Sequence, residues 1–216
     1  MKKQTAFLLA VILIALLPFG YLLTIYDSLP QQVALHYGTD MKPDRMGDKA
    51  ELWLVCSLIA AASVVVYLLL TNINRIDPKR QNSKPSSTFN KLAFGLVIFM
   101  AILNCVIIAS AQGEIDIQKV MFPLMGLMFA FIGNYMNHIK PNYFAGIRLP
   151  WTLSSDENWR RTHQLAGKIW FAGGVLIAIL GLVLPATAAF PVFIGALAVM
   201  VLIPVIYSYR LFKQHV

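Results

Sequence analysis

The residue types that could do chemistry or bind a partner gather in one stretch of the chain, residues 140–164. This stretch holds four cationic residues, two Trp, two Pro and a His, whereas the sequence on either side is almost entirely aliphatic. A hydrolytic or transfer reaction would need a nucleophile with a base, or paired carboxylates. His163 supplies neither by itself, and the polar residues 154–157 are typical of a helix start. We therefore predict no catalytic residue and no cofactor, with a membrane-embedded hydrolase or lipid-modifying enzyme as an alternative.

A second polar cluster lies near the N-terminus. From His36 to Asp48 a His or an Asp recurs at every fourth position, which on a helix would make an oxygen-rich face suited to a metal ion. Two Gly and a Pro interrupt this segment, so a helix is not expected, and the order of residues matches no calcium-binding loop. We predict a solvated acidic loop that folds over the outer mouth of the protein and carries no metal.

Long apolar segments must position both loops. The chain of 216 residues is 58% hydrophobic and only 13% charged, against about 25% charged residues in a soluble domain. Four runs contain no Asp, Glu, Lys, Arg or His, and a fifth, 169–209, is long enough to cross a membrane twice around a Pro-containing break. The sequence therefore predicts an all-α polytopic membrane protein with six transmembrane helices, at residues 5–26, 52–72, 92–111, 120–137, 167–185 and 189–208.

The cations set the orientation. With the N-terminus inside, the inner segments hold 14 Lys and Arg and the outer loops hold 4, which predicts an N-in/C-in topology in a bacterial cytoplasmic membrane. The net charge of +8 then faces an anionic inner leaflet, so lipids account for it and no direct contact with nucleic acid is expected. We divide the chain into 1–74 with an outer loop at 27–51, a cytoplasmic basic loop at 75–91, and 92–216 with a cytoplasmic loop at 138–166. The cytoplasmic loop at 138–166 is called the signature loop below.

Local signals predict the shape of the signature loop. Pro141 should close the preceding helix, and Pro150 should hold Leu149 in an extended conformation. Ser154 with Glu157 matches a capping box, which predicts a helix lying along the inner membrane interface, with its Trp side chains at headgroup depth, before the fifth span begins. The simplest interpretation is an aromatic and basic belt. The density of cations, rigid turns and aromatic rings also fits a surface that binds a partner.

The segment "NYMNHIKPNYFAGIRLPWTLSSDENWRRTHQLAGKIW" resembles the hallmark segment of the SdpI family, bacterial membrane proteins of the sporulation-delaying-protein immunity type. Leu149 departs from the family pattern, which usually has Thr there. The matching residues are Asn142, Gly146, Ile147, Arg148, Pro150, Trp151, Thr152, Leu153, Trp159, Thr162 and His163.

The first outer loop, "LPQQVALHYGTDMKPDRMGDK", is similar to a small domain of unknown function that often precedes the SdpI segment. Ala34 stands where Pro is common in that domain. The matching residues are Pro30, His36, Tyr37, Asp44, Arg45 and Lys49.

These resemblances imply an integral membrane immunity protein that gives resistance to a secreted antimicrobial peptide toxin. In the family's best-known arrangement, such a protein also sequesters a small cytoplasmic winged-helix repressor at the membrane and so takes part in signal transduction. We expect partner binding at Asn142, Gly146, Arg148, Pro150, Trp151, Thr152, Trp159 and His163, and recognition in the outer loop at His36, Tyr37, Asp44 and Arg45. The alternative function is a small polytopic transporter of a lipid or small molecule.

Overall fold

Six long helices dominate the structure, a computed structural model that describes residues 2–80, 86–113 and 115–214. Each of the six is long and apolar enough to span a membrane, so the predicted all-α polytopic architecture is confirmed. The observed bounds lie close to the predicted ones for most of the spans. The helices are α1 (Lys2–Ile25), α2 (Glu51–Thr71), α4 (Ser87–Ala111), α5 (Ile117–Met136), α7 (Asp156–Val183) and α8 (Ala186–Lys213).

Short elements lie in the connections. After α1 come the 3-10 turn η1 (Tyr26–Ser28) and an antiparallel hairpin of β1 (Gln32–Tyr37) and β2 (Pro43–Asp48), which the sequence did not predict. The hairpin turn closes through Gly38 and Met41, and Met41 adopts a φ of 59°. The remaining short elements are α3 (Ile73–Ile76), η2 (Pro78–Arg80) and α6 (Pro150–Ser154).

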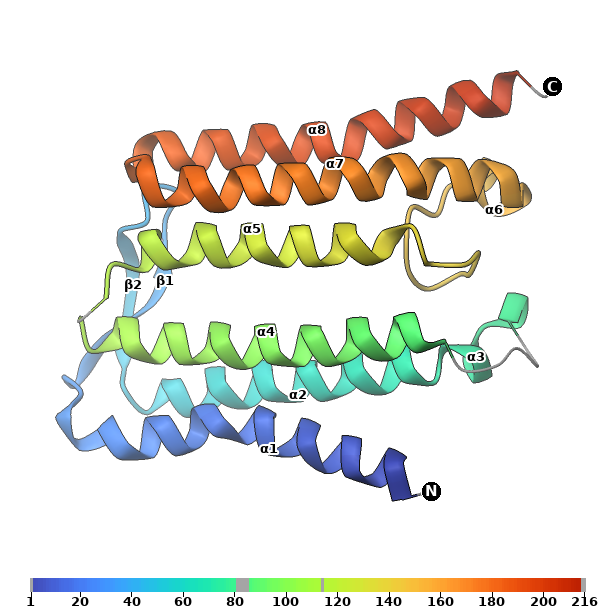
Figure 1. Cartoon of the computed structure of the whole chain (residues 1–216). Helices are drawn as coiled ribbons and strands as arrows, with labels where there is room; N and C mark the ends of the chain where they lie inside the picture. Colours follow the sequence, from blue (N-terminus) through green and yellow to red (C-terminus); the bar gives the residue numbers. More distant parts are fainter. Residues whose placement is uncertain (1, 81–85, 114, 215–216) are drawn as a thin grey trace.

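The two ends of the helix bundle differ in character (Figure 1). Both chain termini, α3, α6 and the signature loop lie at one end, which we call the terminal end, and the β1–β2 hairpin lies at the opposite, hairpin end. The predicted layout, with both termini and the signature loop on one side, is therefore present. Which face of the membrane the terminal end occupies stays a prediction from the charge distribution.

The helices form two groups of three. Helix α4 packs chiefly on α2 and α1, α7 packs on α5 and α8, and contact between α4 and α5 joins the groups. The tightest pair is α5 with α7, where glycines let the backbones approach so closely that an added Cβ would overlap the backbone of the facing helix. Small residues play this role in membranes because association of spans depends on close packing. The glycines are Gly126 and Gly133 on α5 and Gly167 and Gly174 on α7.

One predicted element is wrong. The segment predicted as an interfacial helix before the fifth span is not a separate helix, because residues 156–166 are the first turns of one continuous helix, α7. Ser155 rather than Ser154 is the N-cap, because its hydroxyl accepts a hydrogen bond from the Asn158 N–H at 3.2 Å, while Ser154 ends α6. Glu157 pairs with Arg160 at 2.7 Å. The first turns of α7 bury the polar side chains of Asn158, Thr162 and His163 inside the protein.

Candidate functional site

Asn142 organises the tip of the signature loop. Its side chain is fully buried and makes four hydrogen bonds to the surrounding backbone. The amide nitrogen donates to the carbonyls of Lys140 and Ala145, both at 2.9 Å, and the amide oxygen accepts the N–H groups of Phe144 at 2.8 Å and Ala145 at 2.7 Å. Both donors and both lone pairs of the amide are thereby used. The loop is therefore wound around this side chain into one fixed turn.

His163 fixes the next part of the loop. Its Nε2 accepts the Ile147 N–H at 3.0 Å, so the ring proton belongs on Nδ1, which donates to the Trp159 carbonyl at 2.9 Å. The Trp159 ring stacks on the imidazole with centroids 4.1 Å apart. Gly146 passes over both rings with φ +113°, and a Cβ there would overlap His163 Nε2. Only glycine meets both demands at this position.

Trp159 also ties the loop to the end of α5. Its indole N–H donates to the Ile139 carbonyl at 2.8 Å, and only 1% of the residue is exposed. Trp159 therefore faces the interior of the protein and not the lipid. An i, i+4 spacing with His163 on α7 aims both side chains into the protein, where Phe89, Leu92 and other buried apolar side chains surround the indole.

Thr152 closes the turn at Pro150. The fully buried hydroxyl accepts the Leu149 N–H at 2.9 Å and donates to the carbonyls of Ile147 at 2.8 Å or Leu149 at 3.0 Å. Leu149 is extended (φ −116°, ψ 154°), as the following proline predicted, and Pro150 is the first residue of α6. Because Leu149 uses its backbone here, a Leu in place of the usual Thr leaves this contact intact.

Trp151 joins the loop to the last helix. Its indole N–H donates to the Ser208 hydroxyl of α8 at 2.9 Å, and its ring packs against Tyr209 and Phe212. Asn158 of α7 donates to the Ser208 carbonyl at 2.9 Å and accepts the Thr162 hydroxyl at 3.0 Å. Ser208 is fully buried, so one residue of α8 fixes both the loop and the start of α7.

Asp77 is a site residue that the sequence analysis missed. It is fully buried between α3 and η2, and its carboxylate accepts the Tyr143 N–H and the Lys79 N–H, both at 2.8 Å. Lys79 in turn donates to the Leu153 carbonyl at 2.6 Å and lies 3.7 Å from Asp156. These contacts attach the loop before α4 to the signature loop. A signal was present, since Asp77 is the one acidic residue within the basic segment 75–91.

Some side chains of the signature loop are exposed at the surface. Tyr143 and Phe144 are 48% and 46% exposed, and Arg148 lies at the surface with Nη1 donating to the Tyr143 carbonyl at 2.5 Å. Most of the predicted partner-binding residues instead face inward. Asn142, Thr152, Trp159 and His163 are buried, Trp151 is half-buried, and Gly146 and Pro150 shape the backbone.

The residues expected to act in outer recognition lie on the hairpin. His36 Nδ1 and the Asp44 carboxylate are 2.6 Å apart, and Arg45 pairs with Glu51 at 2.8 Å, with all four side chains exposed by at least two fifths. Tyr37 points back to the bundle and donates to the Ser110 hydroxyl of α4 at 3.2 Å. In the parts of the chain that the structure describes, no three His, Cys, Asp or Glu side chains converge on a point.

The hairpin is held firmly on the bundle. Lys49 donates to the Tyr26 carbonyl at 3.0 Å, and its ammonium lies 4.7 Å from the centre of the Tyr26 ring. Val33 is buried in an apolar cluster with Leu22 and Leu52 of the first two helices. The exposed His36–Asp44 and Arg45–Glu51 pairs therefore stand on a rigid base.

Comparisons with known proteins agree with both sequence resemblances. The model of the SdpI/YfhL protein family matches residues 138–208, and that of a domain of unknown function (DUF1648) matches residues 13–60. The chain carries the SdpI/YfhL segment. It is also similar to Immunity protein SdpI of Bacillus subtilis (strain 168), with 22% identity over 169 residues, covering 78% of each chain. No solved structure matches the chain significantly.

The SdpI/YfhL segment coincides with one structural unit. It begins as α5 gives way to the signature loop and ends at Ser208, the residue of α8 that accepts the Trp151 indole and the Asn158 amide. The matched sequence thus contains the signature loop and the two helices that hold it. Asp77 and Lys79 lie outside that segment and outside the DUF1648 match, in the connection between the two.

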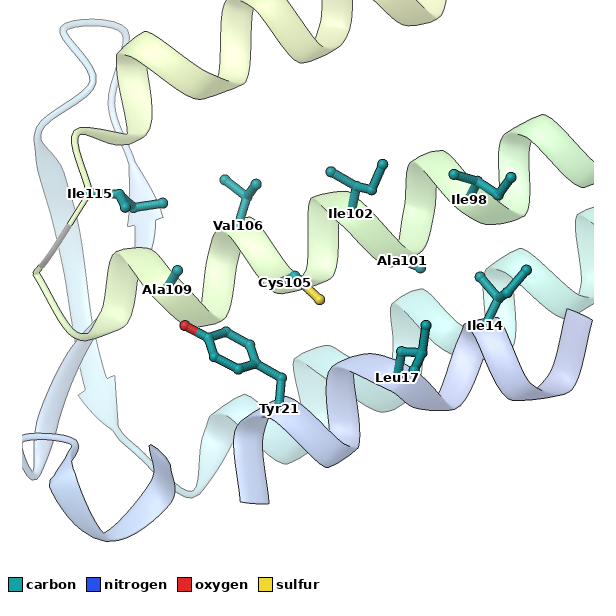
Figure 2. A pocket seen from close by; sticks show the side chains of 10 residues that line it. All are labelled: Ile14, Leu17, Tyr21, Ile98, Ala101, Ile102, Cys105, Val106, Ala109 and Ile115. Atoms are coloured by element: carbon teal, nitrogen blue, oxygen red, sulfur yellow. The ribbon is translucent and has the colours of Figure 1, made fainter. Parts of the chain in front are cut away.

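The DUF1648 segment forms one wall of an apolar groove at the hairpin half of the bundle (Figure 2). The groove measures about 520 Å³ and lies between α1 and α4, with Ile14, Leu17 and Tyr21 on one side and Ile102 and Cys105 on the other. Ile115 lies at the end nearest the hairpin, and the Tyr21 hydroxyl donates to the Gln112 side-chain oxygen at 3.4 Å.

Asn104 is a buried polar side chain within α4, and it makes a contact between two helices. It is 1% exposed on α4, and its amide nitrogen donates to the Cys56 carbonyl of α2 at 3.2 Å. Such bonds hold spans together in the absence of a hydrophobic driving force.

Proposed function

We propose that this protein is an immunity protein of a bacterial cytoplasmic membrane that protects the cell against a secreted, membrane-active peptide toxin. The observation that carries the proposal is the similarity to Immunity protein SdpI over 78% of the chain, together with a six-span bundle that presents a rigid hairpin at one end. The protein acts by binding and needs no catalysis. The excess of cations in the segments at the terminal end supports placing that end in the cytoplasm and the hairpin outside.

The orientation can be tested by cysteine labelling. In a background without Cys56 and Cys105, Gln32→Cys on the hairpin should react with a membrane-impermeant maleimide in intact cells. Gln214→Cys, beyond the end of α8, should react only after lysis. Labelling of residue 214 in intact cells would refute the proposed orientation.

The immunity function is tested by expressing the chain in a toxin-sensitive bacterial strain and challenging it with sporulation-delaying-type peptides. Survival should rise as it does with the Bacillus subtilis relative, which serves as the positive control. Absence of protection against peptides that the relative resists, at equal abundance in the membrane, would speak against the proposal for those peptides.

We assign contact with the toxin to the exposed pairs of the hairpin. Arg45→Gln and His36→Gln remove exposed charges or hydrogen bonds on a rigid base, so protein abundance should stay unchanged while protection falls. Lys119→Gln is the matched control, because Lys119 is also exposed at the hairpin end. Full protection by both hairpin variants would mean that the toxin contacts another part of the protein.

The signature loop supports a second role, the capture of a winged-helix repressor. Tyr143, Phe144 and Arg148 form an exposed facet of the loop that can meet a protein, and aromatic and Arg side chains are the usual hot spots of such contacts. If the chain's operon encodes such a repressor, Phe144→Ala should abolish its recruitment to the membrane while protection persists. Arg161→Gln, an exposed cation on α7, is the control. Recruitment by the Phe144 variant at the wild-type level would exclude this facet.

A further inference from the structure

A second cavity opens at the terminal end, among α1, α2 and α4, and belongs neither to the signature loop nor to the hairpin. It measures about 420 Å³. Its mouth is polar and its inner wall is apolar. The mouth is lined by Asn72, Asn74, Arg75, Asn90 and Lys91, and the wall by Phe7, Leu8, Leu68 and Phe94.

The polar and apolar parts lie at different depths. Asn72 caps the end of α2, and Leu68 lies one turn further into that span. Phe94 likewise lies one turn inside α4 from Asn90, and its ring meets Phe7 edge-on with centroids 6.2 Å apart. The cavity therefore runs from the helix ends, where headgroups lie, into the layer of acyl chains.

The mouth carries positive charge that no described acidic residue compensates. Arg75 and Lys91 are both exposed, neither forms an ion pair with a described residue, and no Asp or Glu lines the cavity. The Arg160 side chain elsewhere at this end differs, since it is paired with Glu157. The cavity thus offers two unneutralised cations beside amide groups, above an aromatic and aliphatic wall.

From this combination we infer a binding site for one anionic glycerophospholipid of the adjacent leaflet, with its phosphate between Arg75 and Lys91 and an acyl chain along Phe7 and Phe94. Basic pockets between spans select anionic headgroups, and the deeper wall suits a chain that a free phosphate ion lacks. Each cation near an anionic lipid contributes roughly a fivefold preference, so two cations predict about a 30-fold preference, equivalent to about 2 kcal/mol.

The experiment measures lipid binding to the full chain in detergent by native mass spectrometry. Phosphatidylglycerol and phosphatidylcholine with the same acyl chains are titrated as separate probes, and inorganic phosphate is the third. Wild-type protein should bind the first phosphatidylglycerol about 30-fold more tightly than phosphatidylcholine, and millimolar phosphate should not displace it. The double variant Arg75→Gln/Lys91→Gln should lose this preference, and Phe7→Ala should weaken binding of both lipids.

The matched control is Arg210→Gln/Lys213→Gln, which removes the same two residue types at the same end of the bundle but on α8. It should keep the preference. Equal binding of the two lipids by wild-type protein, displacement by phosphate, or equal loss in the control variant would each overturn the assignment. Arg75 and Lys91 are exposed, so their substitution leaves the fold intact, and the single variant Lys91→Gln should show about a fivefold loss.

Discussion

The replacement Asn142→Ala gives the sharpest test of how the signature loop is built. It removes four hydrogen bonds between the buried amide and the loop backbone. At about 0.5–1.5 kcal/mol for each bond, the loop should lose about 2–6 kcal/mol of stability against local opening. The low end alone corresponds to about a 30-fold increase in the open population. The spans should stay folded, because their packing does not depend on this amide.

Chymotrypsin provides the assay, because it cuts after aromatic residues and the loop exposes Tyr143 and Phe144. When a loop opens and closes quickly, cleavage follows the population of the open form. We expect purified Asn142→Ala protein in detergent to be cleaved at these residues about 30-fold faster than the wild type, or more. Asn142→Asp keeps the two accepted bonds and replaces both donors, so its cleavage rate should fall between the two.

The matched control is Asn137→Ala, which makes the same chemical change at an exposed position near the end of α5. Its cleavage should stay close to the wild-type rate. If the Asn142→Ala and Asn137→Ala proteins are cut at the same rate, the amide does not hold the loop, and the hydrogen-bond reasoning fails.

Three further changes test other parts of the structure. Gly146→Ala should destabilise the protein by about 1–3 kcal/mol, because φ is +113° and a neighbouring ring occupies the space of the added Cβ. Gly20→Ala is the comparison, because the space around that position is open. Thermal melting followed by circular dichroism measures the stability of both variants. Trp151→Phe should lower the free energy of unfolding by about 1 kcal/mol, because the hydrogen bond to the Ser208 hydroxyl is lost. Adding Ser208→Ala should lower it little further, and a double-mutant cycle in the same melts measures the difference. Asp77→Ala should speed chymotryptic cleavage of the signature loop about tenfold or more, because a bond to the Tyr143 N–H is lost; an unchanged rate would mean that this link does not restrain the loop.

Sequence reasoning located the spans well because length and lack of charge are strong constraints in a membrane. The run from residue 92 to 113 contains no charged residue, and α4 covers it as far as Ala111 and begins a few residues earlier, at Ser87. The hairpin escaped prediction because its strands are short and its pairing shifts register around His36. The alternation of apolar and polar residues that marks a strand is recognisable only over a longer segment.

The cap of α7 and the link through Asp77 were missed for a different reason. Ser154 and Ser155 offer equivalent hydroxyls in the sequence, and only the position of α6 decides which of them starts α7. The Asp77 carboxylate meets Tyr143 across 66 positions of the chain, a contact that no local pattern encodes. The position of a helix is encoded by the local sequence, whereas the contacts of a loop depend on how the spans are packed.

Because the signature residues are buried, the fold alone can explain why these residue types are present. Asn142, Thr152 and His163 each complete hydrogen bonds inside the loop, so the structure would demand these residue types even if nothing ever bound there. A strict motif is therefore weak support for a partner when its polar atoms face inward.

The useful comparison is between Arg148→Lys and Trp151→Tyr. Arg148 is exposed and makes one bond to a carbonyl, so Lys should preserve the fold and fail only where a partner needs the guanidinium fork. Trp151→Tyr should weaken the loop itself, because a shorter side chain cannot make the same bond to Ser208. Loss of repressor capture in Arg148→Lys, with wild-type resistance to chymotrypsin, would separate recognition from architecture.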